Sequence, residues 1–213
     1  MFFNRIAAIS GVIAVVLGVL HGALLGDRPT LDDPIEDVVQ YIGDDLTMHR
    51  LSMVLGILVL PFFIVFFAGI VSKLRDGDRE LNEAWGIAAL AGAISVGAAA
   101  AIADTFVVLL FLRGGDGLDD STVRVIYDGF VVAYGSAGIA IAGVTGSVAI
   151  AAIRREFWPS WYGWLSALAA VIGFISVGGI LWTSSTGLLL GFAAFIGFRV
   201  WTLATSVLMY REN

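Results

Sequence analysis

The stretch AAAAIADTFVVLLFLRGG, residues 98–115, holds a single carboxylate, Asp104, in an apolar run that extends to Leu112. A helix needs about 20 mostly apolar residues to cross the hydrocarbon core of a bilayer, and this run completes one such segment. The whole chain has the same character, because 59% of its 213 residues are hydrophobic and only 14% are charged. Soluble domains carry roughly 25% charged residues, so we expect lipid to be the main solvent of this chain.

Six apolar runs are long enough to span a membrane. They cover residues 6–25, 51–71, 85–112, 125–153, 161–182 and 187–210. The first run is too long for the apolar region of a signal peptide, so we expect it to be a retained span. The sequence therefore predicts an all-α, polytopic bundle of six transmembrane helices in a single domain, residues 1–213.

The connection between the first two spans carries the signals of a short helix. Asp33 is a suitable N-cap, Pro34 fits the first helical position and Gly43 fits the C-terminus. The apolar residues recur at helical spacing, which predicts one apolar face: Ile35, Val38, Val39 and Ile42. We expect an amphipathic helix on the outer side of the membrane, acting either as a connector or as a lid over a cavity.

Basic residues predict the orientation, because cytoplasmic loops of membrane proteins are enriched in Lys and Arg. With a cytoplasmic N-terminus, the inner side holds Arg5, Lys73, Arg75, Arg79, Arg154, Arg155 and Arg211. The outer side holds Arg28, Arg50, Arg113 and Arg124. We therefore expect a multi-pass protein of the plasma membrane with both termini in the cytoplasm.

Composition also excludes several kinds of function. The chain has no cysteine, which rules out disulfides and thiol catalysis. Its net charge of −6 argues against a nucleic-acid partner, because such binding needs a basic surface. No nucleophile elbow and no phosphate-binding glycine loop occurs in the sequence. These observations favour a protein that is not an enzyme, although they do not decide the question.

Small residues recur every four positions in two spans, which predicts close helix packing. The third span has Ala89, Ala93, Gly97 and Ala101, and the fourth has Gly138, Ala142 and Gly146. We expect these two spans to form the tight core of the bundle. Asp104 follows Ala101 by three residues, so it shares the small-residue face and should point into the bundle.

A carboxylate inside a membrane needs a partner, a proton or water. Asp104 lies eight residues from the outer end of its span, about 12 Å deep. Arg199 lies twelve residues into the last span, about 18 Å deep from the same side, and Thr202 and Ser206 continue its face. We expect an Asp104–Arg199 contact if the third and sixth spans are neighbours, acting either as a structural brace or as a gate or coupling site.

A second group of polar residues lies near the outer boundary. It consists of His21, His49, Arg50 and Asp128. Two histidines at similar depth are candidates for a metal or haem site. Alternatively, His21 bonds to Asp128 or to a loop carbonyl, and His49 caps the second span.

The segment FWPSWYGWLSALAAVIGF, residues 157–174, has an inner-face Pro and Trp that open a small-residue span. The basic loop KLRDGDRELNEAWG, residues 73–86, precedes another span rich in Ala and Gly. This layout resembles that of uncharacterised bacterial and archaeal six-helix membrane proteins. The resemblance implies the number of spans and transfers no catalytic residue.

The sequence leaves three functions open. The first is a non-enzymatic accessory or interaction subunit, or a binder of a lipid or small apolar ligand between the helices. The second is a small ion- or proton-coupled transporter or channel that uses Asp104 and Arg199. The third is a haem- or metal-binding protein that uses His21 and His49. We predict no cofactor, and the expected partners are the bilayer and either another membrane protein or further copies of the chain.

Overall fold

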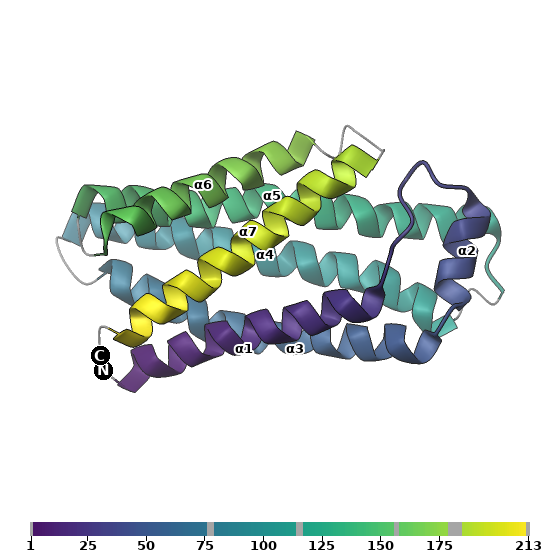
Figure 1. The fold of residues 1–213 in the computed structure, drawn as a ribbon, viewed down its shortest axis with the longest axis horizontal. Coiled ribbons are helices and arrows are strands. Elements are labelled where there is room, and N and C mark those ends of the chain that lie inside the picture. The colour runs from purple at the N-terminus through teal and green to yellow at the C-terminus, as the bar shows by residue number, and fades with distance from the viewer. Residues whose placement is uncertain (1, 76–78, 114–116, 156–157, 179–184, 212–213) are drawn as a thin grey trace.

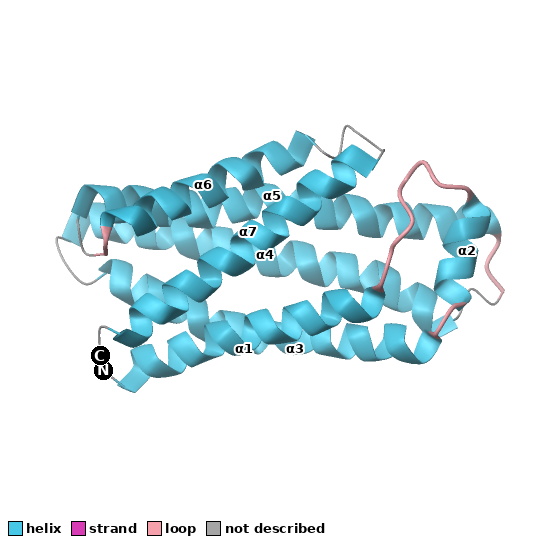
Figure 2. Cartoon of the chain, in the orientation of Figure 1, coloured by secondary structure: helices cyan, strands magenta, loops and turns pink. Residues whose placement is uncertain are grey.

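The computed structural model describes residues 2–75, 79–113, 117–155, 158–178 and 185–211. Helices dominate these residues (Figures 1 and 2). They are α1 (Phe2–Leu25), α2 (Ile35–Gly43), α3 (Leu46–Arg75), α4 (Arg79–Arg113), α5 (Asp120–Arg155), α6 (Ser160–Val177) and α7 (Ser185–Arg211).

All of these helices except α2 are long and apolar enough to cross a membrane. The prediction of an all-α bundle with six candidate spans and a short helix after the first span is therefore confirmed. Residues 179–182 of the fifth predicted span, and the start of the connector that follows them, lie outside the described residues. The six spans indicate a multi-pass membrane protein.

The spans form a closed ring in which neighbours in sequence are neighbours in space. Each packs on the next in the order α1, α3, α4, α5, α6 and α7, and α7 returns to α1. Figure 1 shows α7 crossing the bundle obliquely, with both chain ends at one end and α2 lying across the other. In this ring α4 and α7 lie on opposite sides, and α5 contacts α7 across the middle.

The small residues of α5 face a different helix from the one predicted. A Cβ on Gly138 would lie 2.7 Å from the Gly173 carbonyl oxygen of α6, and one on Gly173 would lie 2.8 Å from the Gly138 oxygen. Contact with α4 uses another position, since a Cβ on Gly92 would lie 2.7 Å from the Val144 backbone nitrogen. Close backbone approach therefore fixes α5 against both of its neighbours, through different faces.

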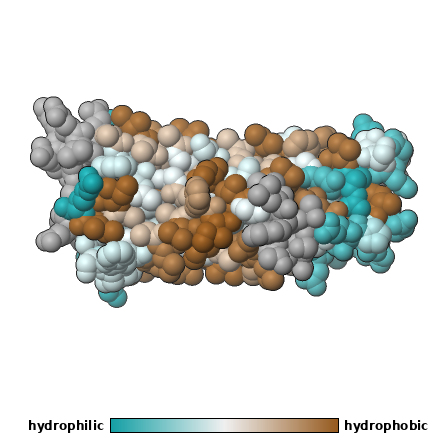
Figure 3. Space-filling view, turned by 90° about the horizontal axis from the view of Figure 1, so that it is seen from above, coloured by the Kyte–Doolittle hydropathy of each residue, from teal (hydrophilic) through white to brown (hydrophobic). Residues whose placement is uncertain are grey.

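Two apolar clusters form the interior. The first lies toward the chain ends and includes Phe66, Ile70, Tyr162 and Trp201. The second lies toward α2 and includes Val38, Ile42, Phe111 and Tyr127. Outside them, large apolar side chains are exposed along the spans, and Figure 3 shows hydrophobic atoms over the middle of the bundle and hydrophilic atoms at the α2 end. This surface suits a molecule surrounded by acyl chains.

The short helix α2 closes one end of the bundle. It buries Val38, Tyr41 and Ile42 against α4 and α5, whereas Val39, predicted on the buried face, is 41% exposed. Tyr41 rather than Val39 completes the buried face, because successive residues are about 100° apart around a helix, which places Val39 nearly opposite Tyr41. Asp33 also differs from the prediction, because its carboxylate accepts from the Thr30 N–H at 2.5 Å and not from the helix.

Candidate functional site

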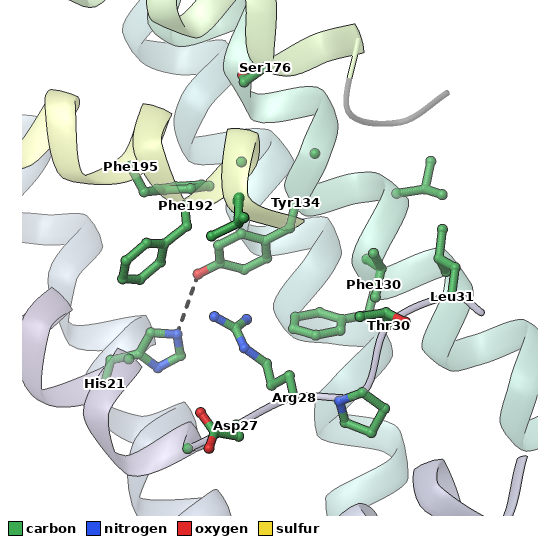
Figure 4. A pocket seen from close by; sticks show the side chains of 18 of the residues that line it. His21, Asp27, Arg28, Thr30, Leu31, Phe130, Tyr134, Ser176, Phe192 and Phe195 are labelled. Carbon is green, nitrogen blue, oxygen red and sulfur yellow. Dashed lines mark hydrogen bonds between the residues drawn. The ribbon is translucent and has the colours of Figure 1, made fainter. Parts of the chain in front are cut away.

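A cavity of about 680 Å³ opens between α1, α5, α7 and the segment that follows α1. Figure 4 shows side chains from these four parts converging on it. The apolar part of its lining includes Val19, Val131, Leu189, Phe192 and Phe195, and the polar part includes His21, Asp27, Arg28, Tyr134 and Arg199. The site is therefore amphipathic and combines aliphatic and aromatic walls with a few polar groups.

Part of the mouth of the cavity is formed by apolar side chains. Val19 of α1 is 48% exposed, and Leu189 and Phe192 of α7 are 65% and 57% exposed. These side chains line the cavity and also belong to the hydrophobic surface of two spans. The cavity therefore communicates with the part of the surface that lipid chains would cover.

Arg28 enters the cavity from the segment between α1 and α2. Its guanidinium carbon lies 5.8 Å from the centre of the Phe130 ring and 5.7 Å from that of Tyr134. These distances are those of cation–π contacts. Figure 4 shows the guanidinium directed toward Tyr134 and His21.

Hydrogen bonds from α5 and α2 hold this segment in place. Tyr127 donates to the Pro29 carbonyl at 2.9 Å, and Arg124 donates to the carbonyl oxygens of Leu31 and Asp33. Tyr41 of α2 donates to the Leu25 carbonyl at 3.1 Å. Burial raises the pKa of Tyr41 to about 12, against the opposing effect of the Arg28 charge, so its hydroxyl remains a donor at neutral pH.

Arg199 of α7 lines the cavity and lies against α1. Its Nη2 donates to the Gly18 carbonyl at 2.6 Å. Cβ atoms on Gly18 and Gly22 would lie 3.7 and 3.6 Å from Nη2, within ordinary van der Waals contact, so the guanidinium lies directly over these two positions of α1. The two glycines are four residues apart and therefore lie on one helix face.

His21 connects three helices at the floor of the cavity. Its Nδ1 lies 2.8 Å from the Ser52 carbonyl oxygen of α3, which can only accept, so Nδ1 carries a proton. Nε2 of the neutral ring then accepts from the Tyr134 hydroxyl at 3.3 Å (Figure 4). The Ser52 hydroxyl donates to the His21 carbonyl at 2.7 Å. The Ser52 hydroxyl proton points at this backbone carbonyl and not at the ring, so the His21 imidazole does not activate Ser52 as a nucleophile.

Asp104 points into the bundle, as predicted, and is only 8% exposed. Its Oδ1 finds no hydrogen-bond partner in the described part of the chain. Its Oδ2 lies near Gly56, where a Cβ would be 3.3 Å from Oδ2 and 3.0 Å from the His21 Nδ1.

The structure does not bring Asp104 and Arg199 together as an ion pair within its described residues. The contact was expected only if the third and sixth spans were neighbours. These spans, α4 and α7, lie on opposite sides of the ring. The two residues that continue the Arg199 face are buried elsewhere. Thr202 donates to the Phe198 carbonyl at 2.9 Å, and the Ser206 hydroxyl lies beside Gly11 of α1.

The outer-boundary residues are also separated. His49 stacks on Phe111 with 4.3 Å between ring centres, and Arg50 donates to the carbonyl oxygens of Phe111 and Leu112 at the end of α4. Asp128 lies 3.8 Å from Arg124, one turn earlier in α5. Only His21 of this group lines the cavity. Across the described ranges, no three His, Cys, Asp or Glu side chains gather at a possible metal site.

Arg28 and Tyr134 line the cavity but were not predicted as site residues from the sequence. Arg28 was counted only as an outer-loop charge, because nothing in a loop sequence shows that its side chain turns inward. A signal for Tyr134 was present, since Tyr127, Phe130 and Tyr134 recur at helical spacing and predict an aromatic face on one helix.

No known protein family matches the sequence, and no curated protein or solved structure matches it either. The resemblance to prokaryotic six-helix proteins thus extends to the number of candidate spans and identifies no family.

Proposed function

We propose that the protein is a non-enzymatic membrane protein that binds a lipid or another small apolar molecule in the cavity between α1, α5 and α7. The observation that carries this proposal is the cavity itself, with its volume of about 680 Å³ and its mixed lining. Small-molecule sites have volumes of about 300–1,000 Å³, mostly apolar walls and a few convergent polar groups.

The position of the mouth supports a ligand that arrives from the bilayer. Val19, Leu189 and Phe192 are both cavity walls and exposed surface of the spans. A hydrocarbon chain can pass between such side chains without leaving an apolar environment, whereas a strongly polar solute would lose its hydration there.

A binding role also agrees with the hydrogen bonds at the cavity floor. Both ring nitrogens of His21 are engaged by Ser52 and Tyr134, and the Ser52 proton is given to a backbone carbonyl. These bonds hold the floor rigid and leave no base aimed at a nucleophile.

Among the residues that the structure describes, neither of the two alternatives has a supporting contact. An ion pair between Asp104 and Arg199 would support coupled transport. Two histidines that face one cavity would support haem binding. Arg199 instead binds the Gly18 carbonyl, and His49 stacks on Phe111 away from the cavity lining.

We further propose that the α2 end faces the outside of the plasma membrane and that both termini are cytoplasmic. Lys and Arg are more numerous at the end of the bundle where the two chain termini lie, and this supports the orientation. An apolar ligand would then enter the cavity from the outer half of the bilayer.

A glycine variant tests the site directly. Gly191 lines the cavity and has no heavy atom within 4 Å of a Cβ placed on it, so Gly191→Leu fills the space without a backbone clash. The full chain would be purified in mild detergent and its bound amphiphiles extracted and quantified by mass spectrometry. We expect Gly191→Leu to retain about tenfold less ligand, equivalent to ~1.4 kcal/mol of binding free energy.

Gly97→Leu is the matched control, because Gly97 is a glycine of α4 outside the cavity and its nearest neighbour would be Leu60 at 3.9 Å. It should retain as much ligand as the wild type. Equal retention by both variants, or a wild-type protein that neither carries nor takes up any amphiphile, contradicts the proposal.

A further inference from the structure

Two guanidinium groups reach the cavity without a carboxylate partner. Arg28 rests against the rings of Phe130 and Tyr134, and Arg199 donates one hydrogen bond to the Gly18 carbonyl. Within the ranges that the structure describes, neither arginine forms an ion pair, and Arg28 donates no hydrogen bond. An arginine fork has five N–H donors, so most of the donor capacity at this site is unused.

The two arginines also act on each other. Arg28 and Arg199 both line this cavity, and like charges that share a cavity repel each other. Repulsion of this kind is stronger beside apolar walls than in water, because the local dielectric constant is lower. A single negative charge placed between them would interact favourably with both and remove that cost.

The nearby carboxylates do not fill this role. Asp27 lines the cavity but is exposed at its rim, and it forms no ion pair with Arg28 in the described structure. Asp104 is buried outside the lining, and it makes no ion pair within the residues that the structure describes. The cavity lining therefore keeps an excess of positive charge.

We propose that the ligand of this cavity is an anionic amphiphile, whose carboxylate or phosphate headgroup is bound between Arg28 and Arg199 while its hydrocarbon chain leaves past Val19, Leu189 and Phe192. This inference rests on the proposed function and names the chemical class of its ligand. Guanidinium groups bind carboxylates and phosphates through paired, charge-assisted hydrogen bonds. The apolar part of the mouth accounts for the chain, since its side chains are continuous with the lipid-facing surface.

Four probes separate headgroup charge from hydrocarbon chain. They are dodecyl phosphate, dodecanoate, neutral dodecanol and inorganic phosphate. Each probe is titrated into the purified protein, and the three dodecyl compounds are kept below their critical micelle concentrations. Binding would be followed by calorimetry and by the shift in unfolding temperature. We expect the two anionic amphiphiles to bind at least about tenfold more tightly than dodecanol, because each charge-assisted contact contributes about 1.5–3 kcal/mol.

Arg28→Gln and Arg199→Gln should remove this preference and leave dodecanol affinity within about twofold of the wild type. Arg113→Gln is the matched control, because Arg113 is exposed at the end of α4 and outside the cavity lining while the charge change is the same. Arg28→Lys keeps the charge without the fork and should restore part of the preference. The comparison of probes on the wild-type protein needs no variant, so a variant that fails to fold does not leave the question open.

Four results would overturn the inference. Dodecanol that binds as tightly as dodecyl phosphate shows that headgroup charge is not recognised. Anionic preference that survives both Arg→Gln changes places the recognition elsewhere. Inorganic phosphate that binds as well as dodecyl phosphate makes the ligand a free anion and not an amphiphile. Absence of binding by all amphiphiles overturns the proposed function as well, whereas equal binding of dodecanol and dodecyl phosphate that Gly191→Leu abolishes overturns only the headgroup assignment.

Discussion

Ser52 and His21 join α3 to α1 through two hydrogen bonds that run in opposite directions. The Ser52 hydroxyl donates to the His21 carbonyl at 2.7 Å, and the His21 Nδ1–H donates to the Ser52 carbonyl at 2.8 Å. Both residues are buried, with Ser52 fully inaccessible. The second bond fixes the tautomer of His21, so that Nε2 faces Tyr134 at the cavity. The geometry of the cavity floor thus depends on the Ser52–His21 contact between α3 and α1.

Ser52→Ala should destabilise the bundle by about 0.5–2 kcal/mol, because one buried bond between helices is lost where no water can replace it. The measurement is the unfolding free energy in mixed micelles with increasing denaturing detergent. Ser95→Ala is the control, since the Ser95 hydroxyl bonds only to the Ala91 carbonyl of its own helix and is exposed. A Ser52→Ala loss no larger than that of the control would contradict the assigned role of the bond.

Gly138→Ala should cost more, on the order of 1–3 kcal/mol, because the added methyl meets backbone that cannot move aside. Its Cβ would lie 2.7 Å from the Gly173 carbonyl oxygen and would also overlap the Ser176 hydroxyl. Gly97→Ala is the matched change, with only the Leu60 side chain at 3.9 Å, and it should be neutral or slightly stabilising. The two unfolding curves, measured in the same detergent, give the comparison. Equal stability of the two variants would show that α5 and α6 are not packed this closely.

Tyr127→Phe should loosen the segment that carries Arg28. The lost bond to the Pro29 carbonyl, 2.9 Å long in the structure, is worth about 0.5–1.5 kcal/mol, so exchange of the backbone amides of Asp27, Arg28, Thr30 and Leu31 should accelerate about two- to tenfold. Hydrogen-exchange mass spectrometry of that peptide measures the change. Tyr210→Phe, on an exposed position of α7, should leave the same peptide unaffected. Unchanged exchange in Tyr127→Phe would show that other contacts hold the segment.

The N-terminus of α5 should depend on pH through Asp119. Hydrogen bonds from the Ser121 hydroxyl and from the backbone N–H and hydroxyl of Thr122 lower the pKa of Asp119 from its usual 3.8 to about 2. Because the folded pKa lies below the unfolded one, the carboxylate stabilises this turn at neutral pH, and the effect is lost as the pH falls from about 4 toward 2. Amide protection of residues 122–124, corrected for intrinsic exchange, should fall over that range.

Asp119→Ala should remove this pH dependence and reduce protection already at pH 7, because the bond to the Thr122 N–H at 3.0 Å is gone. Asp120→Ala removes a charge of the same sign one residue later and should retain the transition. A wild-type protein whose protection is flat between pH 7 and pH 2 would show that the turn does not rely on the ionised carboxylate.

Several features of the fold could be predicted because they depend on local chain properties. The six spans follow from the length and hydropathy of each run, and α2 follows from the spacing of Val38 and Ile42. The inward direction of Asp104 could be predicted because a carboxylate on a helix face next to small residues avoids lipid. Each of these inferences concerns one helix and its solvent.

Pairing between helices could not be predicted in the same way. Depth in the membrane is fixed by counting residues at about 1.5 Å each, so Asp104 and Arg199 were expected at similar levels. Depth does not say which helix lies beside which, and the ring order places α4 opposite α7. The small-residue face of α5 was likewise visible in the sequence, but nothing in it showed that Gly138 would meet Gly173 and not α4.

The sequence by itself therefore determined the class of the protein, the number and extent of its candidate spans and the amphipathic helix between the first two. The tertiary structure alone decided which polar groups meet: Arg199 on the Gly18 carbonyl, His21 between Ser52 and Tyr134, and Arg28 turned inward onto Phe130. The physical reason is that hydropathy acts on each helix separately through its solvent. The rotation and partner of a helix depend on close backbone contacts that exist only once the bundle is packed.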